Sequence, residues 1–161
     1  MRYLLGVLLV ASSVLCDRND YVENSKLGKS YKLMYNAATW QDAKQTCLNN
    51  SGKLAVPKSQ DEFRVIQGLI RKMHYPSIIG WTGSRLLAWV GISSIDEPAW
   101  KTVDGEEIEN TGFATWAKGN GDKSSNPKEP HCAVMDAANS GLRSYWCHYK
   151  QPFVCEFLLN P

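Results

Sequence analysis

The first pattern of apolar and polar residues in the chain is a short amphipathic repeat. Residues 39–48, TWQDAKQTCL, place three apolar side chains on one face at helical spacing: Trp40, Ala43 and Cys47. Thr39 and Asp42 have capping-box spacing, in which each side chain takes up a free backbone N–H of the first turn. The sequence therefore predicts a helix here.

A second helix is predicted over residues 59–73, SQDEFRVIQGLIRKM. Ser59 and Glu62 again have capping-box spacing at its start. Behind them runs a stripe of apolar residues that repeats every three or four positions and is expected to be buried: Phe63, Ile66, Leu69, Ile70 and Met73. This pattern is longer than the first and predicts a helix packed firmly on a core.

The rest of the chain favours strands. Four short segments are apolar or β-branched and are separated by Gly, Pro, Asn and Asp: residues 30–35, 86–94, 131–137 and 151–157. Residues 95–131 show only weak patterning, which in a compact domain indicates a structured or functional loop. Two helices, short strands and one long loop together predict an α+β fold.

The N-terminus has the layout of a secretory signal peptide. Arg2 precedes an apolar run from Leu4 to Leu15, which is too short to span a membrane. We assign residues 1–16 to the signal, 17–29 to an N-terminal segment, 30–157 to one domain and 158–161 to a C-terminal tail. No later segment is apolar enough for a membrane span, so a secreted, extracellular product is expected.

Cysteines stand at positions 16, 47, 132, 147 and 155. Signal cleavage after Cys16 would leave four cysteines in an oxidising compartment, which indicates two disulfides with three alternative pairings. Cleavage after Ser13 would leave an odd thiol and would favour a disulfide-linked dimer. The net charge of +2 carries no block of one sign, so it does not indicate a nucleic-acid partner.

An ordered set of short motifs identifies a family. Residues 89–92 read WVGI, Trp100 is followed by an Asp-Gly turn at residues 104–105, and PFVCE at 152–156 closes the order of four cysteines. Together these resemble the C-type lectin-like domain over residues 30–157. The resemblance implies two helices flanking small antiparallel sheets, a long loop region, and two disulfides, Cys47 with Cys155 and Cys132 with Cys147. It is nearest to short-form, secreted, single-domain lectins of arthropod type.

The resemblance also implies where calcium would bind. Family members supply oxygens from a W-x-x-G-E-P-N motif, or its Q-P-D form, and here the aligned residues 116–122 read WAKGNGD. Asn120 and Asp122 still carry oxygens. The central proline of the motif, however, is Gly121, whose freedom must be frozen at a cost of about 1 kcal/mol.

The other two calcium motifs are altered. Pro130 stands where the family has a glutamate, and Glu129 lies one residue further out. In place of the asparagine and aspartate of W-N-D the chain has Arg143 and Ser144. A cation about 4 Å from another costs about 4 kcal/mol at an effective dielectric of 20. Since calcium needs six to eight oxygens, we expect binding at Asn120, Asp122 and Glu129 to be weak or absent.

Two functions follow as hypotheses. The first is a secreted recognition protein of innate immunity that binds carbohydrate or microbial surface glycans with weakened or lost calcium dependence. Its contacts would come from the long loop and the strand before the fourth cysteine: Lys118, Asn120, Asp122, Glu129, Arg143, Tyr145 and Trp146. The alternative is a module that binds a protein through the same face without sugar. Weak single sites favour a homo-oligomer.

The remaining candidate residues indicate structure rather than chemistry. Trp81, Trp89, Trp100 and Trp116 are expected to pack in the core. The three histidines have no zinc-site spacing, and no nucleophile elbow, P-loop or carboxylate pair is present, so an enzyme is not expected. Asn49 begins an N-glycosylation sequon, Asn-Asn-Ser.

Overall fold

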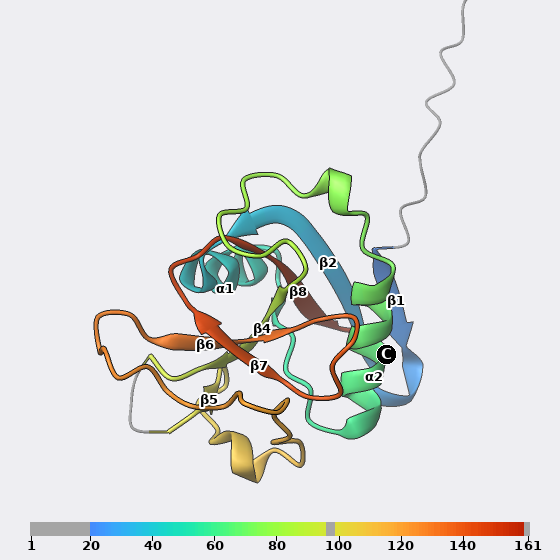
Figure 1. Ribbon diagram of the computed structural model, residues 1–161. Helices are drawn as coiled ribbons and strands as arrows, with labels where there is room; N and C mark the ends of the chain where they lie inside the picture. The colour runs from blue at the N-terminus through green and yellow to red at the C-terminus, as the bar shows by residue number, and fades with distance from the viewer. Residues whose placement is uncertain (1–19, 96–98, 160–161) are drawn as a thin grey trace, which may run out of the picture.

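The computed structural model describes residues 20–95 and 99–159 (Figure 1). Two helices, α1 (Trp40–Asn49) and α2 (Gln60–Arg71), accompany an eight-stranded mixed sheet. Its strands are β1 (Tyr21–Asn24), β2 (Lys29–Ala38), β3 (Lys53–Leu54), β4 (Ala88–Ser93), β5 (Lys101–Thr102), β6 (His131–Met135), β7 (Arg143–Trp146) and β8 (Gln151–Leu158). Three 3-10 turns complete the described elements: Ser25–Leu27, Tyr75–Ser77 and Ile108–Asn110.

The sheet has the order β1-β2-β8-β4-β6-β7, with β3 beside β8 and β5 beside β4. The strands that we expected in small antiparallel sheets are joined, because β4 pairs in parallel with β8 at Trp89 and Phe153. The four predicted strands correspond to β2, β4, β6 and β8. Strands β3 and β5 have two residues each, which is too short for a residue pattern to indicate. Strand β1 lies in the N-terminal segment and pairs with β2.

Both helices begin where the capping signals predict. The Thr39 hydroxyl accepts the N–H of Asp42, and the Ser59 hydroxyl accepts the N–H of Glu62. Neither acidic side chain returns to the cap's own N–H as the expected box requires. Asp42 instead accepts the Thr39 hydroxyl proton at 2.7 Å, and Glu62 turns into the protein.

The helices cover opposite faces of the sheet, because side chains alternate along each strand. The predicted stripe of α2 is buried, with Ile66 and Ile70 fully inaccessible, and it packs with Val90 and Val154. On the other face, Trp40 and Ala43 of α1 pack with the neighbouring strand residues, Trp89 and Phe153. The Cys47–Cys155 disulfide joins α1 to β8, as the family resemblance implied.

Charged residues form a cluster at the β2, β3 and β8 side of the body. Glu62 and Glu156 are each 3% exposed. Glu62 accepts Lys29 Nζ, the Tyr31 hydroxyl and the backbone N–H of Lys58, all within 2.9 Å. Glu156 accepts the N–H of Val56 and lies 3.4 Å from Lys53 Nζ. Burial alone would raise the pKa of Glu62, but these donors hold it below its ordinary value.

Candidate functional site

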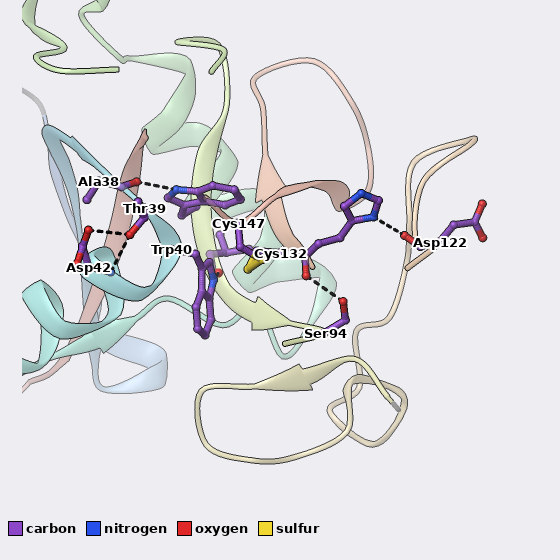
Figure 2. Close-up of a disulfide and its surroundings, with 11 residues drawn as sticks. Ala38, Thr39, Trp40, Asp42, Ser94, Asp122, Cys132 and Cys147 are labelled. Carbon is purple, nitrogen blue, oxygen red and sulfur yellow. Dashed lines mark hydrogen bonds between the residues drawn. A yellow bond between two sulfur atoms is a disulfide. The ribbon is translucent and has the colours of Figure 1, made fainter. Parts of the chain in front are cut away.

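The hairpin of β6 and β7 carries the candidate site and is closed by the second predicted disulfide, Cys132–Cys147 (Figure 2). β7 is the last strand of the sheet, so its outer edge is free for another segment. The long loop runs along that edge. Leu142 donates its N–H to the carbonyl of Thr115 at 2.9 Å, and Ala117 donates to the carbonyl of Leu142 at 2.8 Å.

Asn120 continues this attachment with its side chain. Its Oδ1 accepts the backbone N–H of Ser144 in β7 at 3.2 Å, and its Nδ2 donates to the carbonyl of Lys118 at 3.2 Å. The side-chain oxygen that the motif would offer to calcium is thus bonded to the protein itself. Asn120 serves as a strap between the loop and the sheet edge.

Gly121 has a conformation that excludes the family's proline. Its φ is +98°, whereas proline is fixed near −65°. Its carbonyl accepts the Trp100 indole N–H at 2.7 Å, and a Cβ placed here would lie 2.8 Å from the Trp116 ring. The Trp100 and Trp116 rings pack with centroids 4.6 Å apart. The loop is therefore anchored by two tryptophans along a path that differs from the expected metal-binding turn.

The two acidic residues of the expected metal site, Asp122 and Glu129, make different contacts. Asp122 is exposed, and its backbone carbonyl accepts the His131 Nδ1–H at 2.9 Å while its carboxylate points away from the disulfide (Figure 2). Glu129 is exposed and accepts Asn126 Nδ2 at 3.3 Å within its own turn. Over residues 20–95 and 99–159, no three His, Cys, Asp or Glu side chains converge as a metal site. The donor set does not fit calcium coordination.

Arg143 forms an ion pair within the β6–β7 hairpin. Its Nη1 donates to Asp136 Oδ2 at 3.0 Å, at the start of the β6–β7 turn. Burial alone would raise the pKa of Asp136, but hydrogen bonds from Asn139, Ala138 and Arg143 hold it below its ordinary value. Arg143 therefore faces the β6–β7 turn, and the structure does not bring its guanidinium into a bond with the long loop.

The exposed end of β7 carries aromatic side chains. Trp146 is 42% exposed, and its ring lies 5.6 Å from those of His131 and Tyr145 and 6.1 Å from that of Tyr149. Burial raises the pKa of Tyr145, with Tyr149 adding to the effect. We call Tyr145, Trp146, Tyr149 and His131 the aromatic surface. It lies where the long loop rejoins the sheet, and Lys118 is exposed on that loop.

His131 and Tyr149 were missed as site residues. Cys132 and Cys147 define the hairpin, and its register pairs His131 directly with Trp146. The proposed disulfide does not indicate that pairing, because cysteines directly opposite each other in antiparallel strands would place His131 against His148. Tyr149 carries no signal either.

The prediction of burial is confirmed for some of the tryptophans and wrong for one. Trp89 and Trp100 are buried and Trp116 is half-buried, but the prediction that Trp81 packs in the core is wrong. Trp81 is 44% exposed in the segment before β4, where the Arg85 guanidinium lies 5.9 Å from its ring centroid. Residue type alone predicted burial, whereas the loop leaves this side chain at the surface.

Two further expectations concern the ends of elements. Asn49 is the exposed last residue of α1 and accepts Gln45 Nε2 at 2.8 Å, so its glycosylation stays a prediction. The signal peptide and Cys16 lie outside the described residues. No helix in the described part of the chain has the length and apolarity needed to cross a bilayer.

Residues 36–157 match the family described as the lectin C-type domain, and the chain belongs to this family. Its members are non-enzymatic binding proteins, which confirms that the chain is not an enzyme. The fold agrees: the carbohydrate-recognition domain of a mouse scavenger receptor C-type lectin superposes with a TM-score of 0.68 at 22% identity, covering 87% of this chain and 96% of that one.

Insect proteins are among the relatives. A hemolymph lipopolysaccharide-binding protein of Periplaneta americana is 31% identical over 78% of this chain, which spans only 48% of the cockroach protein. Salivary C-type lectin 2 of Aedes albopictus is 29% identical over 95% of this chain and 92% of its own length. A type II antifreeze protein described as calcium-independent superposes with a TM-score of 0.62 at 20% identity, covering 86% of this chain and 92% of that one.

Proposed function

We propose that this protein is a secreted lectin that binds microbial surface glycans without calcium and acts in innate defence. The observation that carries the proposal is the bond from the Ser144 N–H to Asn120 Oδ1, because it engages the side-chain oxygen that a metal would need. The names of the cockroach and mosquito relatives support a role in recognition outside cells. The signal-peptide pattern in residues 1–16 supports secretion.

The proposed contacts come from the aromatic surface and the neighbouring loop. An exposed indole presents a flat apolar face to the C–H side of a sugar ring, and a Tyr hydroxyl beside it can bond a sugar hydroxyl. Lys118, Asp122 and Glu129 would supply charged hydrogen-bonding groups from the loop, and Tyr145 would support Trp146 from the strand. Such a site is shallow, so assembly into homo-oligomers would raise the affinity for a repetitive surface.

A second candidate function is binding of a protein ligand through the same surface. Tryptophan and tyrosine are enriched at protein interfaces, and Trp146 is exposed within a cluster of rings. This alternative needs no metal either. It differs from the first in needing no sugar.

Binding to immobilised bacterial lipopolysaccharide and yeast polysaccharide tests the proposal. We expect equal retention in EDTA and in millimolar calcium, with competition by the soluble polysaccharide. Retention that EDTA abolishes would contradict calcium independence. Absence of retention on both surfaces under both conditions would remove the glycan function and favour the protein-binding alternative.

A further inference from the structure

A cleft lies beside Arg143, away from the loop edge of β7. It has a volume of about 370 Å³, within the range of small-ligand sites. One wall is the segment before β4, with Tyr75, Ser84 and Leu86, and the other is the β6–β7 turn with Asn139 and Arg143. Side chains alternate along β7, so Arg143 and Tyr145 lie on one face of the strand and Ser144 on the other. The cleft is bounded by that face, whereas Asn120 bonds to the edge of the strand at the Ser144 N–H.

The turn wall is held rigidly from two sides. Asp136 is 7% exposed, and its carboxylate accepts the N–H groups of Ala138 and Asn139 at 2.8 and 2.7 Å. From α2, Gln67 Nε2 donates to the carbonyl of Asp136 at 3.0 Å, and Arg71 Nε donates to that of Ala137 at 2.9 Å. A wall fixed in this way loses little entropy when a ligand binds.

Asp136 orients Arg143 but engages only part of its guanidinium group. The carboxylate already receives three donors from the turn, and Arg143 adds one N–H at 3.0 Å. A guanidinium carries five donors in a planar fork. Within the described residues this is its one hydrogen bond, and the side chain is 39% exposed. Its remaining donors can therefore meet a ligand at the cleft.

The other lining groups indicate the kind of ligand. Leu86 is 55% exposed, which leaves an apolar side chain at the cleft for the C–H face of a ring. Tyr75, Ser84 and Asn139, which carry polar groups, also line the cleft. A planar fork pairs with a carboxylate or a phosphate through two parallel hydrogen bonds. A doubly charged phosphate is less suitable, because Arg143 is the only cation among the lining residues and Asp136 lies beside it.

We propose that this cleft binds a sugar residue that bears a carboxylate, with the guanidinium of Arg143 holding the carboxylate and Leu86 facing the ring. The inference rests on the proposed glycan-binding function and names a class of sugar within it. It requires no metal. It also assigns Arg143 to a separate subsite from Trp146, although both belong to β7.

The test is an amide NMR titration of the whole domain in EDTA with three probes: methyl β-glucuronide, methyl β-glucoside and glucose 6-phosphate. We expect saturable shifts at Ser84, Asn139 and Arg143 with the glucuronide, at an affinity about tenfold above that for the glucoside, a factor worth about 1.4 kcal/mol. Equal binding of all three probes, or tighter binding of the phosphate, would overturn the carboxylate assignment.

Variants then locate the contact. Arg143→Gln should reduce glucuronide binding to the glucoside level, and Arg143→Lys should lose about fivefold because an ammonium lacks the planar fork. Leu86→Asp tests the same cleft without touching the Asp136 bonds, since Leu86 is exposed, and should abolish binding by repulsion. Lys32→Gln removes an exposed cation of β2, outside both proposed sites, and is the matched control that should bind as wild type does.

The two proposals fail in different ways. Polysaccharide retention that is lost in Trp146→Ala and kept in Arg143→Gln, together with unaltered glucuronide binding in Arg143→Gln, would overturn the cleft and leave the proposed function standing. Glucuronide binding that disappears in Leu86→Asp and falls to the glucoside level in Arg143→Gln supports the cleft whatever the polysaccharide surface shows.

Discussion

The carboxylates in the body of the molecule and those in its long loop are arranged in opposite ways. Glu62 and Glu156 are buried and lie on either side of Lys29, at 2.8 and 3.7 Å from its Nζ. Asp122 and Glu129 are exposed, and no cluster brings them together with a third metal-binding side chain of the described chain. Acidic groups therefore stabilise the fold in the body, whereas in the loop they remain solvated and separate.

Under the proposed calcium independence, this difference explains how the chain keeps the family fold. In the body, lysines compensate the buried charge. In the loop, hydrogen bonds and ring packing by Asn120, Trp100 and Trp116 hold the chain where a metal would otherwise do so. Stability and loop order are thus supplied by the chain's own groups, and each can be broken separately.

The largest effect is expected from Glu62→Gln. The change keeps the shape of the side chain but removes the charge that Lys29, Tyr31 and the Lys58 N–H all face. Hydrogen bonds to a charged group contribute about 1.5–3 kcal/mol, so unfolding free energy should fall by about 2 kcal/mol. Urea unfolding measures it, and the exposed Asp61→Asn is the control, with a change below about 0.5 kcal/mol.

The same carboxylate sets a pH dependence. Because the pKa of Glu62 is lowered in the folded state, its contribution is complete above the ordinary glutamate pKa near 4.3 and is lost as pH falls through the folded value. Stability of the wild type should therefore decrease below about pH 5 more steeply than that of Glu62→Gln. Parallel pH profiles of the two proteins would contradict this assignment.

On the aromatic surface, Trp146→Ala should lower the affinity for microbial polysaccharide about tenfold, or about 1.4 kcal/mol. Loss of the exposed ring should cost the fold less than about 1 kcal/mol, because its packing is limited to edge contacts with neighbouring rings. Trp81→Ala removes an equally exposed indole from the segment before β4 and should bind as wild type does. Equal loss in both variants would show that the aromatic surface is not the site.

A smaller effect is expected from Asn120→Ala. It removes the acceptor for the Ser144 N–H and should cost about 1 kcal/mol of stability. The clearer readout is amide hydrogen exchange at Ser144, which should accelerate while exchange at Val134 in the interior of β6 does not change. Unaltered protection at Ser144 would mean that the strap does not hold the loop in solution.

Local signals predicted more of the fold than of the site. The caps at Thr39 and Ser59 and the stripe of α2 depend on neighbours in sequence, so the pattern shows them directly. The α+β class follows from the helix and strand patterns, and the disulfide pairing from the family resemblance. Contacts between distant segments could not be predicted: nothing near Glu62 or Asn120 indicates that the one meets Lys29 and the other the backbone of Ser144.

The predictions for the site residues show the same difference between local and distant information. Comparison with the family motif locates the altered calcium motif at Asn120, Gly121 and Asp122, since residue identity alone decides which ligands are missing. The sequence alone groups Arg143 with the loop, because its partner Asp136 begins a turn whose shape the sequence does not reveal. The prediction for Trp81 is wrong for a related reason, because an apolar residue type does not indicate whether the loop that carries it lies against the core.

The most direct test of the account is a calcium titration of the isolated domain, followed by NMR of the amide and side-chain signals of Asn120 and of the amides of Asp122 and Ser144. We expect no saturable shift at these residues up to millimolar calcium, with Ser144 still protected by Asn120. A saturable shift at all three with micromolar affinity would contradict the account, because the Asn120 oxygen would then have left Ser144 for the metal.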